Sequence, residues 1–268
     1  MALTAKLHIE TAWQNERTVL KKSFCTAPFK IADITEDKKQ KSLRIMIMNS
    51  SPGILDDDEL NLQIDVAERC RLELQTQSYQ RLFQMKNGAK QFLNVHLKEG
   101  ASLGYISHPI VPHENSKFIS KNKIVMDETS SLIWGEVMSC GRNLNGEVFK
   151  FSSYHSVTQI FFRDKLVVKE NILMKPAETS LSGIGLLEDY THQASLIFIA
   201  EAEFLNEKKK DIVNLLEACD NLEFGVSDLP VHGIIVRLLG RKAEQLFHLL
   251  KKISAGLSHF KTKEPYVT

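Results

Sequence analysis

Apolar and polar residues alternate along much of the chain, and between Leu62 and Glu136 the alternation is repeated three times. The three passages are LQIDVAERCRLELQT, LNVHLKEGASLGYIS and NKIVMDETSSLIWGE. In each passage an alternating apolar run is followed by a short polar break and a second alternating run. Alternation with period 2 predicts half-buried β-strands, and the polar breaks, which carry Gly, Ser or Asp, favour hairpin turns.

The passages recur at intervals of about 30 residues, a spacing typical of stacked structural repeats. Aligned, they place apolar residues in shared columns: Val66, Leu97 and Met126; Leu72, Leu103 and Leu132; and Leu74, Tyr105 and Trp134. A β unit of this length cannot bury its inner face alone and does so by stacking on its neighbours. We therefore predict a stack of β units, and an ordinary meander of similar hairpins is the alternative.

Further strands are predicted on both sides of the repeats. The N-terminal run AKLHIETAW alternates like an edge strand, and the nearly continuous apolar run LRIMIM is predicted to be an inner strand. After the repeats, the pattern predicts strands at Val148–Ser153, Ser156–Phe162 and Leu166–Met174. The sequence RDK between the last two favours a tight hairpin turn.

The pattern changes near Ser195, where helical spacing appears. A strand, SLIFIA, precedes the helical segment NEKKKDIVNLLEACD, the strands LEFGVSDL and HGIIVRLLG, and the amphipathic helix RKAEQLFHLLKKISAGLSHF. This order predicts a small α+β unit. We predict one mainly β domain over residues 1–268, with a β body at 1–194 and an α+β element containing two helices at 195–268.

Composition limits the classes of partner and the location. The chain has 34 Lys and Arg against 33 Asp and Glu, a net charge of +1, so no cationic excess predicts nucleic-acid binding. Its apolar runs are shorter than the roughly 20 residues of a membrane span, and the N-terminal residues lack the apolar region of a signal peptide. We therefore expect a cytoplasmic protein without a nucleic-acid or membrane partner. The cysteines are widely separated, which argues against a disulfide framework or a zinc ribbon.

The common catalytic motifs are missing from the sequence. It contains no phosphate-binding P-loop, no dinucleotide-binding glycine motif, no GxSxG nucleophile motif and no HExxH zinc motif. Any GTP or ATP chemistry would therefore belong to a partner.

Two polar segments have the residue types of metal ligands. The acidic run at 56–59 supplies oxygen donors that suit a divalent cation, but a solvated acidic turn is favoured. His108 and His113 flank two prolines in the sequence HPIVPH. Imidazoles on a stiff loop suit a borderline metal, but ordinary loop histidines are favoured there.

The segment MSCGRNLNGE is rich in glycine. Gly141 and Gly146 are predicted to provide positive φ angles or close backbone approach, and Arg142 and Glu147 are predicted to pair with each other. A lowered thiol pKa at Cys140 would require an activating base, and no histidine is near it in the sequence. We therefore predict a structural role for this segment.

Two carboxylates interrupt apolar strands. Glu136 shares a face with Trp134, and Glu170 shares a face with Val168 and Ile172. A buried carboxylate must be paired, hydrated or protonated. Two acids on inward faces therefore predict a hydrated polar passage or a buried ion pair.

Several segments, in this order, resemble the urease accessory protein family called UreD, or UreH in some bacteria: SPGILDDDELNLQIDV, LQTQSYQRLFQMKNGAKQ, HPIVPHENSKF and CGRNLNGEVF. The resemblance implies a non-enzymatic scaffold that binds UreF, which recruits the GTPase UreG. The assembly, expected to be a dimer of heterocomplexes, would deliver nickel to apo-urease. The implied fold is a distorted β-helix-like stack of strands with few helices.

The resemblance also implies a polar tunnel for transient passage of nickel, with no tightly bound cofactor. The family's tunnel residues match Asp58, Ser78, Glu136 and Glu170. The chain departs from the family in the turn before Asp58, because residues 54, 56 and 57 replace glycines, and position 136 is often Asp in the family. A β-helical carbohydrate-active enzyme that uses Asp58, Glu136 or Glu170 as acid and base is the alternative function.

Overall fold

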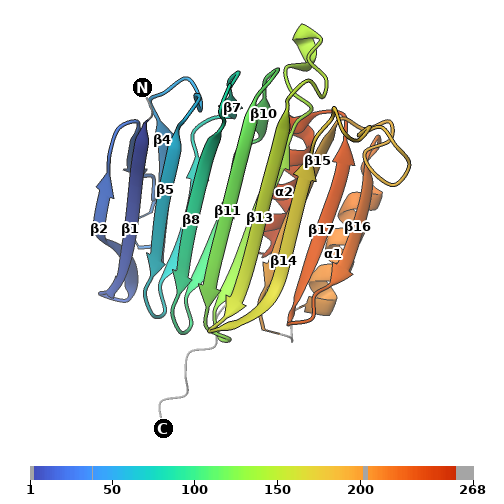
Figure 1. Ribbon diagram of the computed structural model, residues 1–268. Coiled ribbons are helices and arrows are strands. Elements are labelled where there is room, and N and C mark those ends of the chain that lie inside the picture. Colours follow the sequence, from blue (N-terminus) through green and yellow to red (C-terminus); the bar gives the residue numbers. More distant parts are fainter. Residues whose placement is uncertain (1–2, 38, 202–204, 258–268) are drawn as a thin grey trace.

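The computed structural model describes residues 3–37, 39–201 and 205–257, and their strands form two sheets (Figure 1). The seven-stranded sheet contains, in spatial order, β14 (Lys165–Met174), β13 (Ser153–Phe162), β11 (Lys117–Met126), β8 (Ala89–Leu97), β5 (Glu59–Val66), β1 (Thr4–Gln14) and β2 (Arg17–Cys25).

The ten-stranded sheet lies behind it. Its order is β16 (Glu223–Asp228), β17 (Gly233–Gly240), β15 (His192–Ile199), β12 (Ser131–Met138), β9 (Ser102–Ile106), β6 (Arg71–Thr76), β4 (Ser42–Asn49) and β3 (Phe29–Asp33), with β10 (Ile110–Pro112) beside β12 and β7 (Gln80–Leu82) beside β10. The prediction of a mainly β fold is confirmed.

The repeated passages stack as predicted. The first run of each passage lies in the seven-stranded sheet (β5, β8, β11), and the second lies in the ten-stranded sheet (β6, β9, β12). Equivalent strands pair in parallel one repeat apart, and the aligned columns are direct neighbours: Val66, Leu97 and Met126; Leu72, Leu103 and Leu132; Leu74, Tyr105 and Trp134. Matching apolar columns fix this register, because a slip of one residue would turn every apolar side chain outward.

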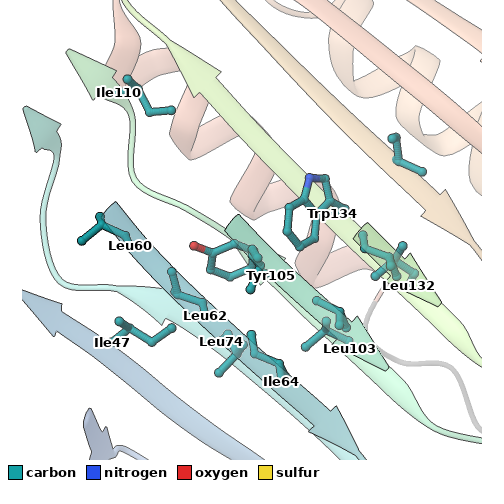
Figure 2. Close-up of a cluster of buried hydrophobic side chains, with 14 of the residues drawn as sticks. Ile47, Leu60, Leu62, Ile64, Leu74, Leu103, Tyr105, Ile110, Leu132 and Trp134 are labelled. Atoms are coloured by element: carbon teal, nitrogen blue, oxygen red, sulfur yellow. The ribbon is translucent and has the colours of Figure 1, made fainter. Parts of the chain in front are cut away.

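The prediction of hairpins at the polar breaks is wrong. Each break does form a turn, closed by backbone hydrogen bonds from Cys70 to Ala67, Ala101 to Lys98 and Ser130 to Asp127. The turn carries the chain across to the other sheet, so the two runs of a passage face each other and do not pair. Both runs bury their apolar side chains in the same interior this way, as Figure 2 shows for Leu62, Leu74 and Tyr105.

Three other strand predictions need correction. The run AKLHIETAW belongs to β1, which lies between β2 and β5 and is not an edge strand. β2 and β3 were not predicted as strands. Val148–Ser153 is not a strand, because Phe149 has φ 54° and bonds back to the Cys140 carbonyl. The predicted hairpin at residues 163–165 is present between β13 and β14.

The strand–helix–strand–strand–helix order after residue 191 is confirmed. β15, β17 and β16 extend the ten-stranded sheet, and the helices α1 (Leu205–Glu217) and α2 (Ala243–Leu257) pack on its outer face. One apolar core lies between the sheets, and a second lies between the ten-stranded sheet and the helices. Within the described residues, neither helix has the length and apolar character needed to cross a membrane.

Candidate functional site

A layer of polar side chains lies between the two sheets. In the seven-stranded sheet, Asn122, Thr158 and Glu170 are register neighbours on β11, β13 and β14. In the ten-stranded sheet, Glu136, Ser195 and Arg237 are register neighbours on β12, β15 and β17. Hydrogen bonds join the two rows across the interior, so we name these six residues the interior polar layer.

Glu136 is held by a buried amide from the opposite sheet. Asn122, which is 2% exposed, donates from Nδ2 to Glu136 Oε1 at 3.0 Å and to Thr158 Oγ1 at 2.9 Å. Burial of the carboxyl group, and after it the negative charge of Glu170, raise the pKa of Glu136 to about 7, although the bond from Asn122 acts in the opposite direction. A substantial fraction of Glu136 is therefore protonated at neutral pH, so the residue is able to exchange a proton for a cation.

Glu170 is buried at the margin of the layer, on the inward face predicted for it. Its side chain is 6% exposed, and its carboxylate accepts hydrogen bonds from Ser195 Oγ at 3.1 Å and from Arg237 at 3.4 Å. The Arg237 side chain is 65% exposed. Arg237 therefore covers Glu170 on the solvent side, and a cation reaching Glu170 from that side meets the guanidinium first.

Two further polar groups, the Trp134 indole Nε1 and the Ser156 hydroxyl, are buried beside Glu136. Both lie close enough to lower its pKa, but neither forms a well-aligned hydrogen bond among the described residues. The indole N–H only donates, so it suits the Glu136 carboxylate or a water molecule and not a cation, whereas the Ser156 hydroxyl also accepts.

A cavity of about 80 Å³ lies at the end of the interior where β5 and β8 begin, and Ser78, Gln91, Tyr105 and His108 are among the residues that line it. One water needs roughly 10–15 Å³ of such space, so several fit. Gln91 pairs in register with Ser120, which pairs with Ser156, so polar positions continue from the cavity toward Glu136. The negative charge of Glu136 also contributes to the raised pKa of Tyr105, although burial is the larger cause.

Of the four residues matched to the family's tunnel, Glu136 and Glu170 lie in the interior polar layer and Ser78 lines the cavity. Asp58 is apart from both. It is buried, and its carboxylate accepts the Leu55 N–H at 2.8 Å, which closes the turn before β5.

The acidic residues beside Asp58 also accept hydrogen bonds that stabilise the local turns. Asp56 accepts the N–H groups of Asn87 and Gly88, and Asp57 accepts the Asn87 amide. Asp57 has φ 65°, a left-handed conformation that Asp tolerates better than most residues do. The turn therefore keeps a backbone geometry suited to glycine although glycine is missing.

The two histidines of HPIVPH are in different environments. His108 bonds Thr76 Oγ1 and packs against the Phe247 ring at 4.5 Å, whereas His113 packs against the Phe83 ring at 4.8 Å. Burial lowers the pKa of both rings. The two imidazoles do not form a joint metal site.

The glycine-rich segment is structural, as predicted. Arg142 and Glu147 pair through two hydrogen bonds, and Gly141 and Gly146 have φ angles of 121° and 73°. Burial raises the pKa of the Cys140 thiol, which disfavours the reactive thiolate.

The described residues contain no group of three or more His, Cys, Asp or Glu side chains placed to hold a metal ion. The interior polar layer instead offers two carboxylates with hydroxyl and amide groups, which are hard oxygen donors. The pattern of carboxylates in apolar strands predicts Glu136 and Glu170 but does not indicate the other inward polar residues Asn122, Ser195 and Arg237. The same face-by-face test would have found Asn122, because it lies in the inward column of Phe118 and Ile124.

Comparison with known proteins gives consistent matches over nearly the whole chain. The profile of the UreD urease accessory protein family matches residues 3–267. The urease accessory protein UreD of Flavobacterium johnsoniae is 42% identical over 259 residues, which cover 94% of this chain and 91% of that protein. UreD of Acetivibrio thermocellus is 34% identical over 250 residues, covering 93% and 95%, and UreD of Actinobacillus pleuropneumoniae is 34% identical over 264 residues, covering 95% and 97%.

Proposed function

This chain belongs to the UreD urease accessory protein family, and on that premise we propose that its interior polar layer passes nickel ions toward apo-urease. Members of the family take part in urease maturation and are not enzymes. Membership therefore overturns the alternative of a carbohydrate-active enzyme. The observation that carries the proposal is the placement of two carboxylates, the buried Glu170 and the half-buried Glu136, between the sheets on strands whose other inward residues are apolar.

The chemistry of the layer suits transport better than storage. A closed cage of thiolates and imidazoles would hold nickel tightly, whereas carboxylates supplemented by hydroxyl groups and water bind it weakly enough for release. The raised pKa of Glu136 adds a driving step, since an arriving divalent cation displaces a proton from the carboxyl group. The Arg237 guanidinium covers Glu170 on the solvent side, so a nickel ion would reach Glu170 from within the layer and not from bulk solvent.

The same proposal includes the partners and the location. The chain would act in the cytoplasm with UreF, the GTPase UreG and apo-urease, in a dimer of heterocomplexes, with nickel as cargo and not as a resident cofactor. The proposal also includes a β-helix-like winding of the chain, which is supported by the crossing of each repeat from one sheet to the other and by its parallel pairing with the next repeat. The ion would follow the polar side chains within this interior, since the rest of it is filled by the apolar core.

The test is urease activation in cells that lack this chain and carry a variant in its place. Glu136→Gln, Glu170→Gln and the double variant are expected to reduce urease-bound nickel and urease activity, most strongly when nickel is scarce, while partner binding persists. Glu128→Gln, at an exposed carboxylate in the turn after β11, is the matched control. Normal activation by the double variant would show that the chain is an adaptor without a role in metal passage.

A further inference from the structure

The outer faces of the two sheets differ in what covers them. The helices α1 and α2 pack on the outer face of the ten-stranded sheet over β9, β12, β15, β16 and β17, whereas no helix lies on the outer face of the seven-stranded sheet within the described residues (Figure 1). Strands β1, β5, β8, β11 and β13 of that sheet are all parallel. Parallel sheets in proteins are usually covered on both faces, so a bare face over so many parallel strands requires an explanation.

The outward positions of β8, β11, β13 and β14 form what we name the lysine face. Their charged side chains are lysines: Lys90, Lys117, Lys121, Lys123 and Lys169. Among the described residues of these four strands, no carboxylate points outward, because the one acid they contain, Glu170, is buried between the sheets. The face therefore has one sign of charge although the whole chain is almost neutral.

Apolar side chains are interleaved with these lysines: Phe92, Ile119, Val125, Val157, Phe161, Leu166 and Leu173. Lys121 lies in register between Phe92 and Val157. Lys123 lies over the Phe161 ring at 5.4 Å, and Leu173 is 55% exposed. Exposed apolar side chains rimmed by polar residues mark surfaces that a partner covers, and it is these side chains that distinguish the face from a purely solvated charged surface.

Two acids beside the face are paired with other residues. Asp65 on the neighbouring strand β5 is bonded to His8 at 2.7 Å and to His96 at 2.9 Å, and Asp127, in the turn after β11, is paired with Arg163 at 3.6 Å. Glu59, also on β5, lies in register beside Lys90, so that lysine has an acidic neighbour. The register neighbours of Lys121, Lys123 and Lys169 are uncharged, so these three lysines are available for charge pairing with another molecule.

The extent of the face also fits an interface. Its strands have nine or ten residues, so four of them cover roughly 30 Å by 20 Å. This is most of the roughly 800 Å² that each partner contributes to a standard protein–protein interface.

We propose that the lysine face is a docking surface for an acidic, partly apolar surface of a protein in the urease maturation complex. Opposite charge would steer the encounter and fix the orientation of the partner, and the apolar side chains would be covered on contact. A nucleic acid fits less well, because the apolar residues between the lysines would stay uncovered and the chain has no overall cationic excess. The inference rests on the proposed function for the identity of the partner, whereas the existence of the lysine face does not depend on it.

The test measures binding of the purified full chain to purified UreF, UreG and apo-urease, singly and together, at low and high salt. Lys121→Glu with Lys123→Glu is expected to weaken binding of at least one partner by about tenfold or more and to reduce the salt dependence of that binding. Lys210→Glu with Lys252→Glu, at exposed lysines of the helices on the opposite sheet, is the matched control and should bind as the parent does. Equal thermal stability of the two variants would show that the fold is intact.

Other results of the binding test would overturn the proposals. If the parent chain binds its partners and the β11 double variant binds them within about twofold of the parent, the lysine face is not the docking surface. Binding to DNA is measured in parallel. If the β11 double variant loses binding to DNA but keeps binding to the three proteins, the lysine face binds nucleic acid and the inference fails. If the parent binds none of the three proteins, the partners named under the proposed function are wrong, and both proposals fall.

Discussion

Replacement of Glu136 by Gln should stabilise the protein at alkaline pH. Glutamine keeps the shape of the side chain and still accepts the bond from Asn122 Nδ2, but it carries no charge to bury. Once the pH exceeds the Glu136 pKa in the folded state, the parent carries an ionised carboxylate between its sheets, and its free energy of unfolding is lower for that reason. The cost should therefore appear as a pH-dependent difference between parent and variant.

The magnitude follows from the shift in pKa. Glu136 has a pKa of about 7 in the folded protein against an ordinary value of 4.5, and each unit corresponds to roughly 1.4 kcal/mol, which gives about 3 kcal/mol. Because the folded state binds the proton more tightly, the stability of the parent relative to the variant falls as the pH rises from about 4.5 to about 7. Above and below that range the difference between the two proteins no longer changes with pH.

Urea unfolding, followed by circular dichroism at a series of pH values between these limits and above them, measures the difference directly. Glu128→Gln serves as the control, because the same chemical change at an exposed turn should leave the pH dependence as it is in the parent. Parallel stability curves for the parent and Glu136→Gln would refute the burial of an ionisable Glu136. A confirmed result would mean that the chain keeps a destabilising acid in its interior, a pattern expected of functional sites.

Urea unfolding also tests two local contacts, the hydrogen bond from Asn122 to Glu136 and the close backbone approach at Gly141. Asn122→Ala removes the amide shared by Glu136 and Thr158, so we expect a loss of about 1–3 kcal/mol and a higher Glu136 pKa, and an unchanged pH midpoint would contradict the assigned contact. Gly141→Ala places a Cβ 2.5 Å from the Glu147 carbonyl oxygen, whereas a Cβ at Gly146 meets nothing within 4 Å. Gly141→Ala should therefore lower the free energy of unfolding by clearly more than the roughly 1 kcal/mol expected for Gly146→Ala. Equal losses in the two variants would refute the close approach at Gly141.

Several features of this chain could be predicted from its sequence. The inward direction of Glu136 and Glu170 follows from alternation along single strands, and the pairing of Arg142 with Glu147 follows from their proximity in the chain. The contacts that define the site were not predictable in this way. Glu170 meets Ser195 and Arg237, which are 25 and 67 residues away along the chain, and no local pattern indicates which distant strand brings a partner.

The amino-acid sequence by itself determined which residues form most strands, which side of each strand is buried, and the register in which the repeats stack. It did so because burial acts on single side chains, and a period of two or a repeat of about 30 residues records that burial locally. Only the tertiary structure decided that each polar break crosses between sheets, that β1 is an inner strand, and that Asn122 reaches Glu136. These outcomes depend on contacts between segments far apart in the chain, whose energies are set by how two whole sheets pack and not by the residues of either one.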